Sequence, residues 1–349
     1  MTKAKAITLL ASPSMIYIAG PVHHSLRERG VDCGKLLTVR YDQFADGEFK
    51  AFIPESIRNT DVYFFHSFYP DINKGIWELL QVNDALRRAD AESFSNVLPY
   101  FTCARQDRKK PREPITAALL AGLLEHQGVR RLFALDLHAD QIQGFFKGPF
   151  DNLFGEHIFL PYFLSKHPDA ANVVAIAADV GGGKRVRAFA RSAAEMIGLS
   201  EPIPFGIIDK DRVAANEVEG MTYGSGPSVE GKHVWISEDM IDTGGTALKA
   251  GKMLFDRGAA SVTLMATHPL FSAKADKVSG IMSSAEEKFA ASGMNVIVTE
   301  TIPRNNAYYE LHKSWLTHLP IDKLFADAIH QSTLVRGSVS GVSKAKKHK

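Results

Sequence analysis

The chain has 349 residues, of which 45% are hydrophobic and 23% are charged, and its formal net charge is +2. This length accommodates two ordinary domains, and the near balance of charge gives no reason to expect a nucleic-acid or membrane partner. Two cysteines, Cys33 and Cys103, cannot build a disulfide framework, which favours a reducing, cytoplasmic location, and no apolar stretch approaches the roughly 20 residues of a membrane span.

Apolar runs rich in β-branched and aromatic residues predict a series of short strands. In chain order they lie at 62–65, 97–101, 132–135, 173–177, 205–208, 234–236, 262–266 and 296–298. Helical patterns lie between several of these runs, at 76–88, 114–126, 184–197 and 246–257. Strands that alternate with helices are typical of an α/β protein whose parallel sheets are covered by helices on both faces.

The order of these elements repeats along the chain. The strand DVYFFHSF, a helix and the strand SNVLPYF match in spacing the strand HVWISEDM, a helix and the strand SVTLMATH. We interpret this as an internal duplication, although similar apolar patterns also arise by chance in α/β chains. Only the second copy then has a glycine pair after its first strand, because the first copy reads FYPDINKG there.

Two loops in the first half of the chain carry residue types suited to ligands. ARQDRKKPREP (104–114) places five basic residues in a proline-broken loop, which is either a solvated charge run or a mobile clamp for an anionic substrate. ALDLHADQIQGFF (134–146) follows a predicted strand, and in an extended strand end Asp136, His138 and Asp140 point to one side. That face could hold Mg²⁺ through oxygen ligands or contact phosphate through the histidine, although a lone histidine beside an apolar strand is more often structural.

The turn DVGGGKRVRAFA (179–190) joins Asp179, at a strand end, to glycines and a helix. Lys184, Arg185 and Arg187 make this turn cationic, which suits a polyphosphate. The alternative is a plain glycine-rich connection with an exposed basic face. No GxxxxGK[ST] follows any predicted strand, which disfavours a P-loop.

The turn SEDMIDTGGTALKAG (237–251) lies between a predicted strand and a predicted helix. Such a turn presents backbone N–H groups at a helix N-terminus, where they attract phosphate. Glycine lets the backbone approach closely, and threonine hydroxyls add donors. The residues suited to wrapping a phosphate are Thr243, Gly244, Gly245 and Thr246.

Three carboxylates in the same turn, Glu238, Asp239 and Asp242, would repel a bare phosphate. They fit if the ligand also carries hydroxyl groups, or if a divalent cation or basic groups offset the charge. A sugar phosphate meets the first condition, because a carboxylate accepts hydrogen bonds from a ribose diol while the loop holds the phosphate. A helix cap with acids placed to suit the dipole is the alternative. Together the four turns indicate phosphate, ribose and a metal ion.

Six motifs in this order, FADGEF, PYFTCARQDRK, REPI, DLHADQIQGFF, IIDKDR and EDMIDTGGT, resemble the ribose-phosphate pyrophosphokinase (PRPP synthetase) family. The match runs from about residue 44 to residue 268, with a weaker echo at GSVSGV near the end. The resemblance implies two type I phosphoribosyltransferase-like domains, each a mainly parallel sheet flanked by helices. They would cover residues 1–155 and 156–319, with a helix at about 320–335 returning to the first domain and a disordered basic tail at 338–349.

The resemblance also implies an activity. Members of this family transfer the β,γ-diphosphoryl group of Mg-ATP to the C1 hydroxyl of ribose 5-phosphate, which gives PRPP and AMP. The expected partners are therefore ATP, ribose 5-phosphate and Mg²⁺. We also expect a homo-oligomer, hexameric or dimer-based, with the ATP site at a subunit interface.

The resemblance assigns roles to residues at matching positions. Those expected at the ATP site are Phe44, Asp46 and Glu48, supplied by a neighbouring subunit, and Arg105, Gln106 and His138. Those expected at the metal are His138 and Asp179. Those expected at ribose 5-phosphate are Asp239, Asp242, Thr243, Gly244, Gly245 and Thr246. Lys210 and Arg212 match the catalytic flap, in which DKDR replaces a more usual basic run.

Two other functions are consistent with parts of this pattern. A non-catalytic relative that binds and regulates a true synthetase could share the whole fold, although the presence of Lys210, Arg212, His138 and Asp179 speaks against it. A phosphoribosyltransferase would share the EDMIDTGGT loop, but it has no reason to carry FADGE and ARQDRK.

Overall fold

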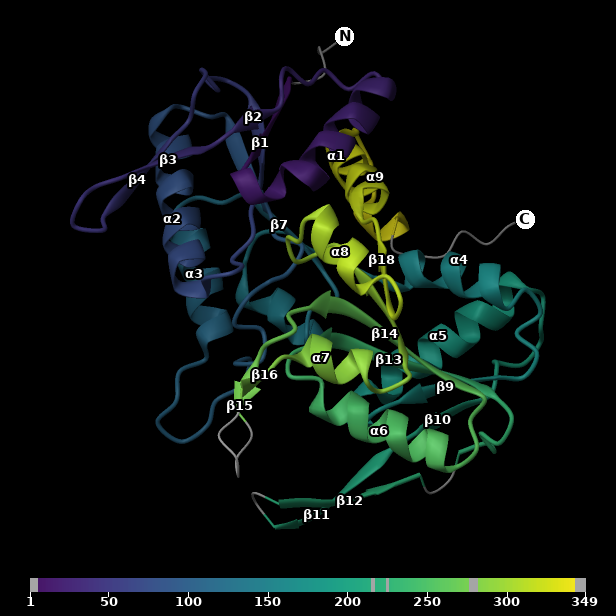
Figure 1. Ribbon diagram of the computed structural model, residues 1–349. Coiled ribbons are helices and arrows are strands. Elements are labelled where there is room, and N and C mark those ends of the chain that lie inside the picture. The colour runs from purple at the N-terminus through teal and green to yellow at the C-terminus, as the bar shows by residue number, and fades with distance from the viewer. Residues whose placement is uncertain (1–5, 215–216, 224–225, 276–281, 343–349) are drawn as a thin grey trace. The chain divides into compact units, whose positions relative to one another are not determined.

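The computed structural model describes residues 6–214, 217–223, 226–275 and 282–342 (Figure 1). The described residues form two compact units. The first comprises residues up to Phe154, together with Thr301–Pro303 and those from Ile321 onward, and the second comprises Gly155–Glu300 and Arg304–Pro320. In this part of the chain, none of the helices has the length and apolar character needed to cross a bilayer.

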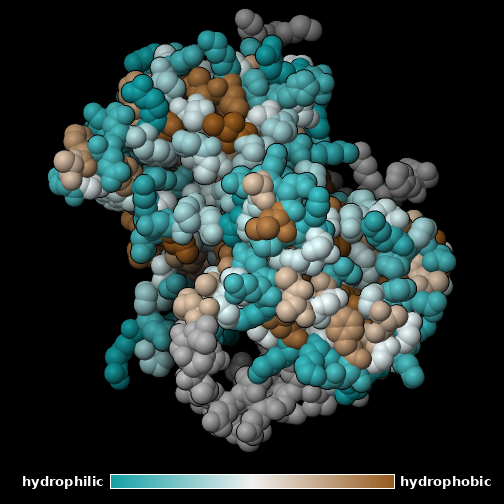
Figure 2. All heavy atoms as spheres, viewed as in Figure 1, coloured by the Kyte–Doolittle hydropathy of each residue, from teal (hydrophilic) through white to brown (hydrophobic). Residues whose placement is uncertain are grey.

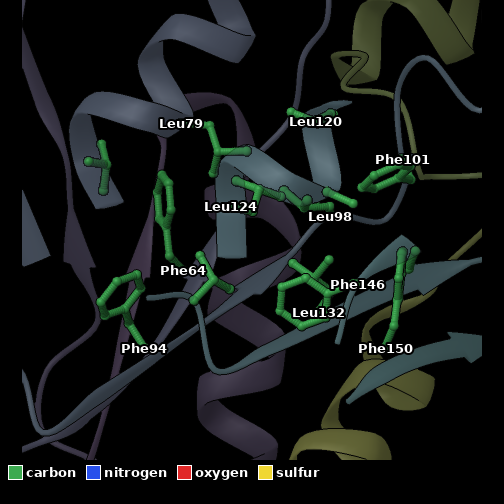
Figure 3. Close-up of a cluster of buried hydrophobic side chains, with 14 of the residues drawn as sticks. Phe64, Leu79, Phe94, Leu98, Phe101, Leu120, Leu124, Leu132, Phe146 and Phe150 are labelled. Carbon is green, nitrogen blue, oxygen red and sulfur yellow. The ribbon is translucent and has the colours of Figure 1, made fainter. Parts of the chain in front are cut away.

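The first unit is built on a six-stranded parallel sheet of order β2-β1-β5-β6-β7-β8. In chain order its strands are β1 (Ile7–Ala11), β2 (Leu37–Thr38), β5 (Asp61–Phe65), β6 (Ser93–Val97), β7 (Arg131–Leu135) and β8 (Phe150–Leu153). On one face, leucines of α2 (Ile72–Arg88) and α3 (Thr116–His126) pack against strand aromatics such as Phe64 and Phe94 (Figure 3). On the other face, α1 (Ile16–Glu28) packs against α9 (Asp322–Thr333), and Tyr63 of β5 hydrogen-bonds Ser332 of α9 over 2.9 Å.

The second unit contains another six-stranded parallel sheet, of order β10-β9-β13-β14-β17-β18. In chain order its strands are β9 (Val173–Ala177), β10 (Phe205–Ile207), β13 (His233–Ile241), β14 (Ser261–Pro269), β17 (Asn295–Thr299) and β18 (Leu316–Leu319). One face packs against α6 (Gly245–Asp256), α7 (Ala285–Ala290) and α8 (Asn306–His312), and the other against α4 (Glu156–Lys166) and α5 (Gly183–Met196). The α/β class and the two helix-flanked parallel sheets are therefore as predicted.

The two sheets share one strand order, because in each the second strand lies at the edge and the first strand beside it. Each unit also has an antiparallel ribbon at the same point of its chain order. These ribbons are β3 (Arg40–Gln43) with β4 (Phe49–Phe52), and β11 (Asp209–Ala214) with β12 (Glu217–Thr222). A third ribbon pairs β15 (Lys274–Ala275) with β16 (Met282–Ser283). The shared order is what the expected duplication requires.

The fold differs from the sequence-based expectation at two places. The strand predicted at 97–101 is wrong, because β6 covers Ser93–Val97 and ends where the prediction begins. The polar residue Asn96 of β6 is nevertheless buried, because its side chain exchanges hydrogen bonds with that of Asn83 in α2. The tail expected from residue 338 begins instead with the 3-10 turn η4 (Val339–Gly341), which packs against α9 and buries Val339. The rest of that expected tail, 343–349, lies outside the described residues.

Candidate active site

The turn after β13 has the geometry of an anion-binding loop. Only Asp242, Thr243 and Gly244 separate β13 from α6, and no described side chain caps the helix. Gly244 is the N-cap residue, with φ of +71°, a left-handed conformation that glycine adopts without strain. The first turn of α6 is therefore suited to a phosphate at its amide groups.

Two glycine variants test whether the turn requires the left-handed backbone conformation of Gly244. Gly244→Ala should lower the free energy of unfolding by about 1–3 kcal/mol, because alanine is strained at positive φ. The added Cβ would also lie 2.6 Å from a ring carbon of the buried Phe289. Gly245→Ala is the matched control, since a Cβ there meets nothing within 4 Å and φ is not positive. Thermal unfolding of both variants checks this; equal melting temperatures would contradict it.

The carboxylates at the end of β13 lie on opposite faces of the sheet. Trp235 belongs to the core beside α4 and α5, and Ile236 belongs to the core beneath α6. By strand alternation Asp239 lies on the side of Trp235 and Glu238 on the side of Ile236. Asp239 is buried, with 7% of its surface exposed, whereas Glu238 is half-buried.

Asp179 lies at the same edge of the sheet. β9 and β13 are paired neighbours, with Ile176 opposite Ile236, so Asp179 and Asp239 each lie three residues beyond that pair. The Asp179 carboxylate accepts a hydrogen bond from the backbone N–H of Gly182 at 3.1 Å and so caps the 3-10 turn η3 (Val180–Gly182) that leads into α5. The fold thus brings the Asp179 turn and the acidic turn of β13 together.

Basic side chains of α5 line a cavity beside this turn. The cavity has a volume of about 520 Å³, and its lining includes Lys184, Arg187 and Arg191 as well as Val180 and Ile207. The guanidinium group of Arg187 lies 5.8 Å from the centre of the Phe205 ring. This arrangement makes the outer side of α5 suitable for anionic groups.

The proposed flap residues lie on the β11–β12 ribbon. Lys210 pairs with Met221 and Arg212 with Val218, and the register shifts on both sides of Arg212. The side chains of Lys210 and Arg212 lie outside the described part of the structure, so the ribbon fixes only their place along the backbone.

In the first unit, Phe44, Asp46 and Glu48 form the exposed tip of the β3–β4 hairpin. The Phe44 N–H donates to the Glu48 carbonyl at 2.7 Å, and the Glu48 N–H donates to the Asp46 carboxylate at 3.1 Å. Phe44 is 50% exposed, with the Lys50 ammonium group 5.6 Å from its ring centre. In Figure 2 the projecting end of this ribbon, at the left of the view, carries both hydrophobic and hydrophilic side chains.

Side-chain hydrogen bonds help to hold the loop that carries Arg105 and Gln106 in place. Arg105 and Gln106 are both exposed, and the Thr116 hydroxyl donates to the Gln106 side-chain oxygen at 2.5 Å. The Gln141 amide donates to the Asp107 carboxylate at 2.8 Å and so ties this loop to DLHADQIQGFF. Thr116 and Gln141 were not singled out from the sequence, because their partners are distant in the chain and no local pattern marks such a contact.

The expectation that Asp136, His138 and Asp140 share one face is wrong. β7 ends at Leu135, Asp136 has φ of +42°, and Asp140 opens the 3-10 helix η2 (Asp140–Phe145). The backbone therefore turns at Asp136, and the alternation of a strand does not continue through it. His138 is exposed.

The residues expected to act together divide between the two units. The hairpin tip, Arg105, Gln106 and His138 belong to the first unit, whereas Asp179, the β11–β12 ribbon and the 239–246 turn belong to the second. Among the described side chains, no group of three or more His, Cys, Asp or Glu residues could hold a metal ion by itself. The oxygen donors of Asp179 suit Mg²⁺, which usually takes few protein ligands together with substrate phosphates.

Comparisons with known proteins identify relatives over most of the chain. Residues 16–128 match the family pattern for the N-terminal domain of ribose phosphate pyrophosphokinase, and residues 224–337 match that for the phosphoribosyl synthetase-associated domain. Ribose-phosphate pyrophosphokinase from Wolinella succinogenes is 40% identical over 298 residues, which are 85% of this chain and 88% of the relative. The protein of the same name from Shewanella oneidensis is 38% identical over 324 residues, 91% of this chain and 96% of the relative.

A solved structure extends the similarity to the fold. The crystal structure of phosphoribosylpyrophosphate synthetase from Mycobacterium smegmatis is 32% identical, with a TM-score of 0.79. The match covers 94% of this chain and 99% of the other. On the sequence matches and this shared fold, the chain belongs to the ribose-phosphate pyrophosphokinase family.

Proposed function

We propose that this protein is an active ribose-phosphate diphosphokinase, which converts ATP and ribose 5-phosphate to AMP and PRPP. The observation that carries the proposal is the edge of the second sheet, where the Gly244 turn, Asp239 and Asp179 lie together. This edge combines a phosphate loop with acceptors for sugar hydroxyls. The family membership supplies the reaction.

In the proposed reaction the C1 hydroxyl oxygen of ribose 5-phosphate bonds to the β-phosphorus of ATP. The bond between that phosphorus and the oxygen bridging to the α-phosphorus breaks, AMP leaves, and the hydroxyl proton is released. Residues 243–246 hold the 5-phosphate, and Asp239 and Asp242 accept hydrogen bonds from the ribose hydroxyls. Lys210 and Arg212 stabilise negative charge on the transferred group, since phosphoryl transfer asks a protein mainly for positioning and electrostatic stabilisation.

Residues of the first unit would bind ATP. Arg105 and Gln106 would contact the nucleotide from their loop, and His138 would contact its phosphates. Phe44, Asp46 and Glu48 would contact the adenine of ATP bound to a neighbouring subunit. The exposure of the hairpin tip supports this role, because an aromatic ring held out on a ribbon is available to another chain. The proposed active form is therefore a homo-oligomer.

Mg²⁺ would be held at Asp179 together with substrate phosphates, and it would neutralise charge on the transferred group. We expect Asp179→Asn to raise the Mg²⁺ concentration needed for half-maximal activity. The amide oxygen can still accept the Gly182 N–H, so the cap is retained while the charge is lost. A titration of activity against Mg²⁺ checks this, and an unchanged curve would remove Asp179 from the metal site.

Two incubations test the alternative functions. Purified protein with Mg-ATP and ribose 5-phosphate should form AMP and PRPP. A regulatory relative would form neither product across a range of phosphate concentrations. A phosphoribosyltransferase would form neither, but it would consume added PRPP in the presence of a nucleobase.

A further inference from the structure

The backbone of Gln106 is fixed on both sides by the core of the first unit. Ala104, two residues before it, and Ala117, in the first turn of α3, are both buried in that core. The Gln106 N–H donates to the Cys103 carbonyl at 2.9 Å, and the Gln106 carbonyl accepts the Ala117 N–H at 3.2 Å. Both backbone groups of Gln106 are therefore satisfied within the protein, although the residue is exposed.

The side chain of Gln106 is also held at one of its two polar atoms. Its oxygen, Oε1, accepts the Thr116 hydroxyl at 2.5 Å. Thr116 is the first residue of α3, and the helix is anchored by the buried residues Ala117, Leu120 and Leu124. A glutamine amide accepts hydrogen bonds at its oxygen and donates them from its amino group. Because the oxygen is engaged by Thr116, this contact decides which way round the amide lies.

The amino group of Gln106 is the polar group that this arrangement offers to a ligand. The contacts with described residues engage its backbone N–H, its backbone carbonyl and Oε1, and the Nε2 amino group carries two further N–H donors. The residue is exposed, so a ligand can reach it. ATP carries matching acceptors in its phosphate oxygens, its ribose oxygens and the ring nitrogens of adenine. An amide in the opposite orientation would meet these acceptors with its own oxygen.

The next residue ties the same loop to a second element. Asp107 is half-buried, and its carboxylate accepts the side-chain amide of Gln141, in η2, at 2.8 Å. Two successive residues are thus bonded to different elements, α3 and η2. This restrains the backbone at the point where the Gln106 side chain leaves it, so less conformational freedom remains to be lost when a ligand binds.

We propose that Thr116 is a positioning residue for ATP. Its hydroxyl orients the Gln106 amide so that the amino group meets acceptor atoms of the nucleotide, and it restrains that side chain before the nucleotide arrives. The inference rests on the proposed function, in which Gln106 contacts ATP. Thr116 acts through Gln106 and not by touching the nucleotide.

Calorimetry on the full-length protein tests this role without turnover. The probe is an ATP analogue in which a methylene group replaces the oxygen between the α- and β-phosphates, titrated in the presence of Mg²⁺. Thr116→Val removes the hydroxyl and nearly retains the shape of the side chain. It should weaken binding of the analogue roughly three- to tenfold, the effect of one lost neutral hydrogen bond.

Two further variants control for changes in the helix. Thr116→Ser keeps the hydroxyl and should bind the analogue as the wild type does. Thr333→Val is the matched control in the same unit, because it removes a half-buried hydroxyl of α9 that donates to the His330 carbonyl at 2.7 Å. It should change nothing.

The direction of the amide is tested by Gln106→Glu. A carboxylate at this position can still accept the Thr116 hydroxyl, but it presents an acceptor where the amino group lay. Binding of the analogue should therefore weaken roughly tenfold or more. Wild-type affinity in this variant would show that Gln106 does not donate to the nucleotide.

A double-mutant cycle separates positioning from structural support. Gln106→Ala should weaken binding of the analogue more than Thr116→Val does, since it removes the amino group itself. In the Gln106→Ala background, Thr116→Val should have no further effect, because no amide is left to orient. A general disturbance of α3 would instead weaken binding in both backgrounds alike.

The kinetic constants give a second readout. In PRPP formation, Thr116→Val should raise the KM for ATP by a factor similar to the loss of analogue affinity and leave kcat nearly unchanged. The proposal is overturned if Thr116→Val or Gln106→Glu binds the analogue like the wild type, if Thr116→Ser binds as weakly as Thr116→Val, or if the effect of Thr116→Val persists without Gln106. Absence of PRPP formation by the wild type, with this pattern of analogue binding intact, would contradict only the proposed function.

Discussion

Replacing Lys210 with alanine should lower kcat by roughly 100-fold or more and change the KM values far less. The reason is that charge on the transferred diphosphoryl group develops mainly in the transition state, so an ammonium group placed to meet it contributes little to binding of the ground state. The β11–β12 ribbon, which lies outside the main sheet of its unit, is a suitable carrier for such a group.

Steady-state kinetics with both substrates varied checks this prediction. Lys252→Ala is the control, because Lys252 is an exposed lysine of the same unit whose contact is a surface ion pair with Asp256 at 2.8 Å. Its kinetics should match the wild type. A large rise in KM with a normal kcat for Lys210→Ala would show that Lys210 only binds substrate.

The second large effect concerns Asp239. Asp239→Ala should lower kcat/KM for ribose 5-phosphate. The decrease should correspond to a loss of about 1.5–3 kcal/mol of transition-state stabilisation, the range for losing hydrogen bonds to a charged group. Glu238→Asp should change little, because Glu238 lies on the opposite face of β13 and is less buried.

Because Asp239 is buried, a loss of stability must be separated from a loss of binding. Thermal unfolding of Asp239→Ala, and kinetics of the isosteric Asp239→Asn, make that separation. If Glu238→Ala proves the more damaging of the two alanine changes, the ribose contact belongs to Glu238, on the face of β13 that carries Ile236.

Several elements were predictable because local sequence and burial coincide there. The run at 173–177 is fully buried and is β9. The helix predicted at 246–257 is α6 to within one residue at each end, because the glycine turn at Gly244 begins it and Gly258, with φ of +84°, follows it. Ala247, Ala250, Gly251 and Leu254 form its buried face.

Other elements could not be read from local pattern. β8 and β18 are short strands whose apolar pattern is interrupted by polar residues. Asn152 of β8, for example, is buried, and its side chain accepts a hydrogen bond from the Leu137 N–H at 3.0 Å. β7 ends at Leu135, where the predicted strand ends, but the extended backbone expected to continue to Asp140 is absent, because Asp136 has a positive φ that no sequence pattern marks. The contact between Asp107 and Gln141 joins two motifs that are distant in the sequence. Such non-local contacts arise from folding and have no signature in spacing.

Transfer of labelled phosphate tests the central claim most directly. ATP labelled at the γ-phosphate is incubated with ribose 5-phosphate, Mg²⁺ and the purified protein, and the products are separated. We predict equal amounts of unlabelled AMP and labelled PRPP, because the β- and γ-phosphates move together. Formation of ADP with a singly phosphorylated sugar product, or no product at any inorganic phosphate concentration, would contradict the proposed reaction.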